Sequence, residues 1–140
     1  WLASNLFVYH GTYVSPVAGA SVAKEVVNLG TSVIMGHTHR RAQIRFRQGN
    51  HEHMGIESGC LCQISSPYSP MTNWAHAITT VDKYDDTHWS AEVHDIITDE
   101  KEGVCYTIFM FIKIEVPLSY DDGLSLPWRP DQVKEYQEEK

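Results

Sequence analysis

The sequence has no long apolar run and few basic residues. No stretch approaches the ~20 consecutive apolar residues that span a bilayer, and no basic segment leads into an apolar stretch with a small-residue cleavage site. Neither a membrane association nor secretion is therefore expected, and we predict a cytoplasmic protein. Lys and Arg number 11 against 18 Asp and Glu, for a formal net charge of −7. This acidic balance argues against a general nucleic-acid binder, which needs surplus Lys and Arg.

Cysteine is also scarce. Cys60, Cys62 and Cys105 cannot all pair with one another, and nothing else indicates a disulfide scaffold. Cys60 and Cys62 are two residues apart in an apparently extended segment, so they share one face. We interpret them as two small buried thiols in a reducing compartment, with a soft-metal pair as the alternative.

What is present fits one globular domain. The chain has 140 residues, 42% of them hydrophobic and 21% charged, which is typical of a folded domain with its own core. The first residue is Trp1 rather than Met, which indicates a processed product or a fragment. We predict a domain over residues 1–116 and an acidic tail over residues 117–140, where "KEYQEEK" closes the chain.

The first third of the chain predicts a β–α–β unit. "NLFVYHG" is an apolar, β-prone run that ends at His10, and "TSVIM" is a second short buried strand. Between them, "GASVAKEVVNLG" has helical spacing of Val22, Val26 and Leu29, with Ser21 expected as N-cap and Gly30 beyond the C-terminus. Two parallel strands joined by a crossover helix place their following loops at one sheet edge, where ligands bind in such sheets.

The rest of the chain predicts antiparallel hairpins. "RAQIRFR" alternates apolar and polar residues, and pairing apolar with apolar favours a three-residue loop, Gly49-Asn50-His51, before the next strand. This register sets Phe46 opposite Met54 and Ile44 opposite Ile56. Further strands are expected around residues 74–81, 89–97 and 104–116, and a short surface helix in "PDQVKEYQEEK". The predicted fold class is α/β, of the α+β sandwich type.

The histidines at the predicted sheet edge suggest a metal site. "GHTH" follows a buried strand directly, and Gly36 would free the backbone to turn sharply before His37 and His39. His10 ends the neighbouring parallel strand and should converge on the same place. Three neutral imidazoles at one edge suit Zn, Mn, Fe or similar ions. The second H-x-H, at His51 and His53, is explained by the hairpin turn.

Together, "FVYHG" and the "GHTHR" that follows a short strand about 25 residues later resemble the C-terminal half of calcineurin-like metallophosphoesterases. The resemblance covers roughly residues 4 to 97 and is closest to bacterial and phage-type members, which also have a "GIESGCL"-like strand and a Tyr/Asn-Trp loop. It implies the C-terminal half of that family's four-layer fold. It also implies hydrolysis of phosphomonoesters or diesters by a water that two metal ions activate.

The resemblance further implies the role of each site residue. His10 and His37 would bind one divalent transition-metal ion and His39 the other, with Mn, Fe, Zn or Ni as candidates. Arg40 and Arg41 could bind the phosphate of the substrate, which could be a nucleotide or a nucleic-acid end. The alternative for Arg41 is a solvated strand face.

The sequence departs from the family in what precedes His10. The D-x-H, GD-x-x-D and GNH(E/D) motifs, which supply the carboxylate ligands and the general-acid histidine, have no room there. No Gly-Asp pair occurs anywhere in the chain, and the "GNHE" at Gly49–Glu52 is in the wrong cyclic order for a permutation. We therefore assign no catalytic residue to this chain and expect it to be inactive alone. The missing ligands would come from an upstream segment or a partner chain.

Two alternatives remain open. The chain could be a catalytically incomplete binding or assembly module derived from that fold, or it could hold one ion on three histidines. The half-domain hypothesis predicts a free sheet edge with exposed apolar surface. The loop Pro67–Trp74 is a candidate site-lining segment, although Tyr68 and Trp74 are better interpreted as cover for the core.

Overall fold

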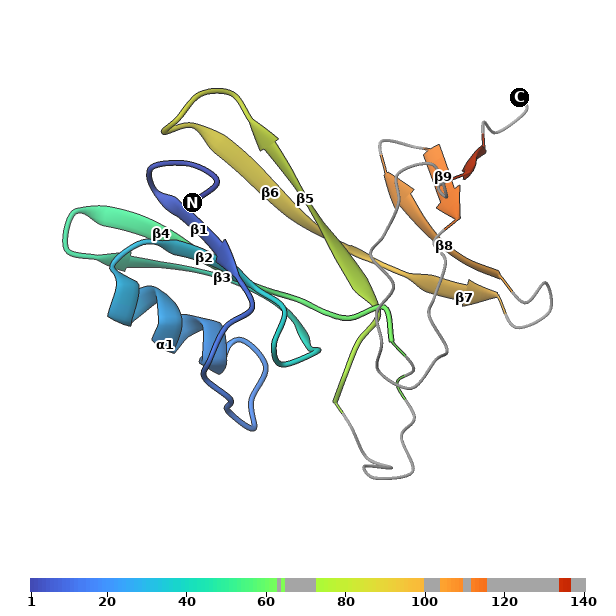
Figure 1. The fold of residues 1–140 in the computed structure, drawn as a ribbon, viewed down its shortest axis with the longest axis horizontal. Coiled ribbons are helices and arrows are strands. Elements are labelled where there is room, and N and C mark those ends of the chain that lie inside the picture. The colour runs from blue at the N-terminus through green and yellow to red at the C-terminus, as the bar shows by residue number, and fades with distance from the viewer. Residues whose placement is uncertain (63, 65–72, 100–103, 110–111, 116–133, 137–140) are drawn as a thin grey trace.

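The described part of the protein is a mixed α/β structure, mostly strands with one helix, in open sheets (Figure 1). The computed structural model describes residues 1–62, 64, 73–99, 104–109, 112–115 and 134–136. Its helix is α1 (Ala20–Leu29), and its strands are β1 (Leu6–Tyr9), β2 (Ser32–Met35), β3 (Arg41–Gln48), β4 (His51–Ser58), β5 (Ala77–Lys83), β6 (Trp89–Asp95), β7 (Ile97–Asp99), β8 (Val104–Phe109), β9 (Ile112–Glu115) and β10 (Lys134–Tyr136). No helix in this part of the chain is long and apolar enough to cross a membrane.

The predicted β–α–β unit is confirmed. β1 and β2 pair in parallel, with Leu6 opposite Ser32 and Tyr9 opposite Met35, and α1 connects them. Gly30 ends the helix in a left-handed conformation, with φ of 64°, and its N–H bonds the Val26 carbonyl at 2.8 Å. Glycine adopts this conformation without the steric cost that a Cβ would add.

The helix begins differently from the prediction. Gly19, not Ser21, is the N-cap, and the N-cap residue makes no side-chain hydrogen bond to the helix. Ser21 is buried, and its hydroxyl accepts a hydrogen bond from the Ser15 N–H at 2.9 Å. The expected apolar stripe is also shorter than predicted, because Leu29 is 43% exposed.

The predicted register of the β3–β4 hairpin is wrong. Gly49 and Asn50 form a two-residue turn, with Gln48 paired to His51, so Ile44 lies opposite Gly55 and Phe46 opposite His53. The prediction assumed that the apolar residues of both strands face one core. β4 is instead covered on both faces, so Met54 and Ile56 face away from Ile44 and Phe46.

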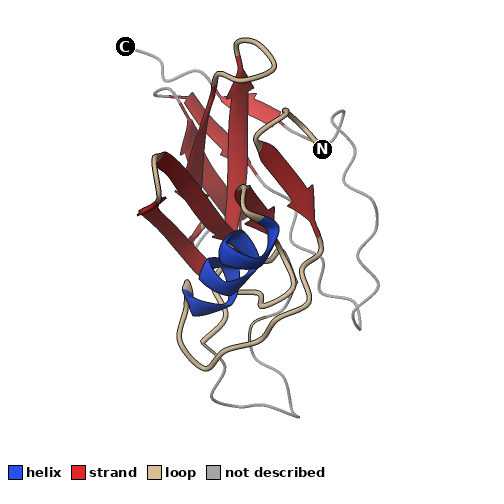
Figure 2. Ribbon diagram, turned by 90° about the vertical axis from the view of Figure 1, so that its left-hand side faces the viewer, coloured by secondary structure: helices blue, strands red, loops and turns tan. Residues whose placement is uncertain are grey.

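These two faces define three layers. The first sheet has the order β1-β2-β4-β3, with β1, β2 and β4 parallel. α1 covers one face of this sheet (Figure 2). There Val22 and Val26 pack against Val33 and Met35. On the other face lies the β5–β6 hairpin, where Ala91 and its neighbours pack against residues of the sheet that include Leu6, Ile34, Met54 and Ile56.

The last part of the described chain also differs from the prediction. The expected single strand over residues 104–116 is two strands, β8 and β9, paired antiparallel with Tyr106 opposite Glu115. The expected terminal helix contains strand β10, which pairs with β9 across the predicted boundary at residue 117. The division into a domain and a tail stays a prediction. Residues 67–72 of the predicted loop lie outside the described residues.

Candidate metal centre

The carboxyl ends of three parallel strands bring the chemistry-bearing residues to one sheet edge. His10 follows β1, His37 follows β2, and Cys60 follows β4. The backbone fastens the first two loops together, because the His10 carbonyl accepts hydrogen bonds from the N–H groups of Gly36, at 3.2 Å, and His37, at 2.8 Å. The predicted convergence of His10 and His37 is therefore a direct contact of main chains.

The side chains of His10 and His37 also meet. His10 Nε2 lies 2.7 Å from His37 Nδ1, and the rings are edge to face with centroids 4.7 Å apart. Two imidazole nitrogens on one ion, with bonds of about 2.1 Å at a right angle, are separated by about 3.0 Å. The two nitrogens are hydrogen-bonded here, so an ion would replace the shared proton, and the rings would turn until both lone pairs point at it.

His39 points to different partners. It has a φ of 57° and is the one non-glycine residue with positive φ in the described chain. Gly36, expected to supply the sharp turn, does not have a positive φ. The strained residue is therefore the histidine itself, at a cost of about 1–3 kcal/mol. Its ring packs edge to face on Trp74, with centroids 4.6 Å apart, so Trp74 lines this site.

The partners of His39 include the Cys60 and Cys62 thiols. One ligand atom from each of these three residues lies within 4.8 Å of the other two, and Cys62 Sγ is 3.7 Å from His39 Nδ1. Both cysteines are half-buried rather than fully buried, unlike Cys105. The sequence interpretation of Cys60 and Cys62 as simple buried thiols missed this cluster. The sequence does not reveal that β4 lies parallel to β2, and this pairing places "GCLC" at the same sheet edge as the histidines.

The protonation states of this cluster follow from burial. Desolvation, then the charges of His10 and His37, lowers the pKa of His39 below its usual 6.5, so its ring is neutral at neutral pH. Burial raises the pKa of the Cys60 thiol, and neighbouring Cys62 raises it further. A neutral imidazole has a free lone pair for an ion, whereas each thiol must lose its proton to become a ligand.

A buried carboxylate supports the GHTH loop from behind. Glu57 of β4 is fully buried, and its Oε2 accepts the Thr38 hydroxyl at 2.9 Å. Its Oε1 accepts the N–H groups of Gly19 and Val22 at 3.1 and 3.3 Å, at the start of α1. One side chain thus replaces the missing cap of the helix and fixes the residue between His37 and His39.

A second carboxylate supports the loop after His10. Glu25 of α1 is 3% exposed, and its Oε1 accepts the Thr12 N–H and hydroxyl at 2.8 and 2.9 Å and the Tyr13 N–H at 3.1 Å. Burial acts to raise the pKa of Glu25, but hydrogen bonds from Tyr9, Thr12 and Tyr13 outweigh it, and the net shift is downward. Burial, with Glu25 as the second cause, raises the pKa of Tyr9 to about 12.

The two candidate phosphate-binding arginines already have partners. Arg40 donates from Nε to Asn73 Oδ1 at 2.7 Å and from a terminal nitrogen to the Ser15 carbonyl. Arg41 is exposed and pairs through Nε with Asp95 at 2.7 Å. Arg40 therefore ties the GHTH loop to the loop before α1, while Arg41 lies on a solvated strand face.

The other histidine motifs lie elsewhere. His51 and His53 begin β4, at the opposite end from Cys60, with ring centroids 6.3 Å apart. In the β5–β6 turn, Asp85 Oδ2 lies 2.7 Å from His88 Nδ1. Asp85 also accepts the N–H groups of Thr87 and His88, and these bonds lower the pKa of its carboxyl. Neither motif joins the metal-type cluster.

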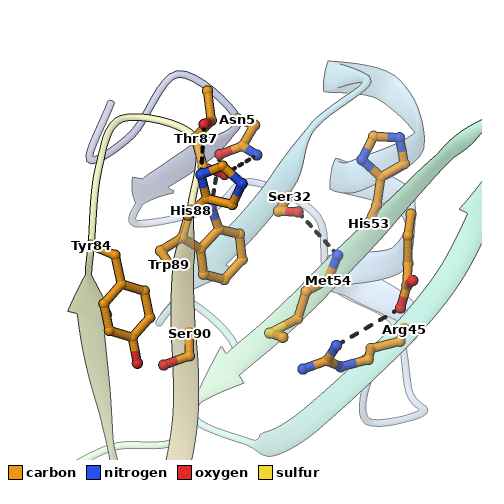
Figure 3. Close-up of a pocket in the computed structure, with 11 residues that line it drawn as sticks. Asn5, Ser32, Arg45, His53, Met54, Tyr84, Thr87, His88, Trp89 and Ser90 are labelled. Carbon is orange, nitrogen blue, oxygen red and sulfur yellow. Dashed lines mark hydrogen bonds and ion pairs between the residues drawn. The ribbon is translucent and has the colours of Figure 1, made fainter.

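A pocket of about 400 Å³ lies at this opposite end of the sheet (Figure 3). Its lining residues are Asn5, Ser32, Arg45, Glu52, His53, Met54, Tyr84, Thr87, His88, Trp89 and Ser90. Arg45 faces Glu52 at 3.8 Å, and Asn5 Oδ1 accepts the Trp89 indole N–H at 2.7 Å. Because these groups pair with one another, the pocket indicates no particular ligand.

Comparison with known proteins gives no relative: no family model, no curated protein and no solved structure matches this chain.

Proposed function

We propose that this chain supplies the histidine-bearing half of a metal-dependent phosphoesterase. His10 and His37 would hold one divalent ion, His39 would contribute to a second, and the remaining ligands would come from a polypeptide segment outside these residues. The observation that carries the proposal is the 2.7 Å separation of His10 Nε2 and His37 Nδ1. It is supported by the resemblance of "FVYHG" and "GHTHR" to the C-terminal half of the calcineurin-like metallophosphoesterase fold.

Bound ions would supply Lewis acidity, lowering the pKa of a water molecule and offsetting charge on phosphoryl oxygens. The residues of the chain itself orient the imidazoles. The His10 carbonyl and Glu57 fix the two histidine loops, so the backbone that carries the rings is positioned before any ion arrives. Such preorganisation lowers the entropic cost of forming the site.

The edge of the first sheet offers a place for the complementary segment. Among the described strands β1 pairs only with β2, so it is an edge strand of the first sheet, as the half-domain proposal requires. Val8 in β1 is 43% exposed and Trp1, before it, is 72% exposed. An unpaired edge strand with exposed apolar side chains is a surface that natural proteins normally cover. An assembly module without catalytic activity would use the same edge.

The test measures metal content and hydrolysis together. The probe is Mn²⁺, with bis(p-nitrophenyl) phosphate as substrate, on the 140-residue chain and on a version extended by any residues that its gene encodes before Trp1. We expect two ions per extended chain with turnover of the diester, and at most one ion without turnover in the shorter chain. His10→Ala and His37→Ala should each reduce turnover by at least about 100-fold.

His51→Ala is the matched control, because His51 is exposed in the β3–β4 hairpin at the far end of the sheet. It should leave metal content and turnover unchanged. Two bound ions without hydrolysis would favour the assembly module. A single ion lost on substitution of any of His10, His37 and His39 would favour the mononuclear site.

A further inference from the structure

Two thiols meet an imidazole at the carboxyl end of β4. His39, Cys60 and Cys62 each offer a ligand atom within 4.8 Å of the other two, with 3.7 Å between Cys62 Sγ and His39 Nδ1. In a tetrahedral zinc site, with Zn–S of about 2.3 Å and Zn–N of about 2.0 Å, adjacent ligand atoms lie about 3.6 Å apart. The separation of Cys62 Sγ and His39 Nδ1 already matches this value, and the other two separations do not exceed 4.8 Å.

The main chain holds this arrangement in place. Ala75 donates to the His39 carbonyl at 2.9 Å and accepts from the Cys60 N–H at 3.0 Å, so one residue joins the histidine to the cysteine segment. Gly59 N–H bonds the Arg40 carbonyl at 2.7 Å. A Cβ at Gly59 would lie 2.7 Å from the Ala75 carbonyl oxygen, so this close approach requires glycine.

Charge also favours an ion here. Three neutral histidines do little to offset a dication, which is the weakness of a site built from His10, His37 and His39 alone. Two thiolates would neutralise one dication fully, and thiolate with imidazole is the ligand set of zinc and other soft or borderline ions. Side-chain donors of this kind need no carboxylate from elsewhere.

We infer that His39, Cys60 and Cys62 form a Cys₂His site for a thiophilic divalent ion such as Zn²⁺, complete within this chain and with a fourth position open. On binding, both thiols release their protons to solvent and the three side chains become ligands. The inference deepens the proposed function, because it assigns the second ion of that centre to these cysteines. It stands separately from the first ion, which His10 and His37 hold.

The experiment titrates the reduced 140-residue chain with Co²⁺, followed by Zn²⁺. Thiolate ligands give Co²⁺ an intense near-ultraviolet charge-transfer band that imidazoles do not give. We expect this band to saturate at one Co²⁺ per chain and to vanish when Zn²⁺ displaces the cobalt. Cys60→Ser and Cys62→Ser should each remove most of the band, and His39→Ala should weaken cobalt affinity by more than about 100-fold.

Cys105→Ala is the cysteine control, since Cys105 is buried with Ile96 beside Leu61 and does not belong to the group of His39, Cys60 and Cys62. It should keep the full band, and circular dichroism should show that every variant remains folded. No charge-transfer band in the parent chain, or a band that survives the double substitution of Cys60 and Cys62, would overturn the inference.

The two proposals fail in different ways. His10→Ala and His37→Ala should leave the thiolate band intact, because neither residue belongs to the Cys₂His site. A thiolate band without any diester hydrolysis in the extended chain supports this site and contradicts the phosphoesterase. Hydrolysis that needs His10 and His37 but shows no thiolate band contradicts this site alone.

Discussion

The Glu57 carboxylate accepts the Thr38 hydroxyl at 2.9 Å from within the protein, so a residue of β4 holds the loop that presents both GHTH histidines. The same carboxylate caps α1 through the N–H groups of Gly19 and Val22. A metal-type site, a helix start and a central strand thus depend on one buried side chain.

Glu57→Gln should destabilise the protein by about 1–3 kcal/mol, because the amide NH₂ replaces an acceptor that faces N–H or O–H donors. Urea unfolding of the metal-free protein measures the change. Glu52→Gln is the control, since Glu52 is exposed in the same strand. Equal stability of the two variants would mean that the Glu57 contacts add nothing to the fold.

The Glu25 contacts predict an acid-sensitive fold. A carboxyl whose pKa is lower in the folded protein contributes stability above its unfolded pKa, and loses that stability as pH falls through the folded value. The free energy of unfolding should therefore decline below about pH 4.5, the ordinary glutamate value. Glu25→Gln should be less stable at pH 7 and should show a shallower decline on acidification. A decline as steep as in the parent protein would assign the acid sensitivity to other carboxyls.

Gly59→Ala tests the close approach between the cysteine segment and Ala75. The added Cβ would meet the Ala75 carbonyl oxygen at 2.7 Å, at a φ of 74°. Gly49→Ala is a matched control with a φ of 61° and no atom within 4 Å. The positive φ alone should cost each variant about 1–2 kcal/mol. Gly59→Ala adds the clash, so thermal or urea unfolding should show a larger loss of unfolding free energy for Gly59→Ala than for Gly49→Ala. Equal losses would show that the contact relaxes without cost.

The positive φ of His39 predicts a conflict between stability and metal binding. With metal removed by a chelator, His39→Gly should be more stable than His39→Ala by about 1 kcal/mol, because glycine relieves the left-handed strain while both variants lose the ring. Neither variant should form the cobalt–thiolate complex at parent affinity. Identical unfolding free energies for the two variants would place the strain elsewhere.

Gly55→Ala tests the observed hairpin register. Its Cβ would lie 3.0 Å from Ile44 and 3.1 Å from two Val22 carbons, between the sheet and α1. Overpacking of this kind typically costs about 1–3 kcal/mol. Gly36→Ala, with no atom within 4 Å of its Cβ, should change unfolding free energy by less than about 1 kcal/mol. A tolerated Gly55→Ala would contradict the close packing of α1 on β4.

The sequence by itself determined the β–α–β unit and the meeting of His10 with His37. Apolar runs ending in histidine, a helical repeat between them and Gly30 beyond it predicted a parallel pair, and parallel strands must end at one edge. Periodicity could report which residues alternate along β3 and β4. It could not report that β4 is covered on both faces, and for that reason the predicted register was wrong.

Only the tertiary structure decided which side chains lie next to His39. Cys60 reaches it because β4 lies parallel to β2, a placement that follows from the packing of α1 on one face and β5–β6 on the other. Glu57 and Glu25 likewise look like ordinary charged residues in sequence, since their partners lie in loops distant along the chain. Contacts between remote segments depend on how layers stack, and that information is distributed over the whole core rather than held in any local motif.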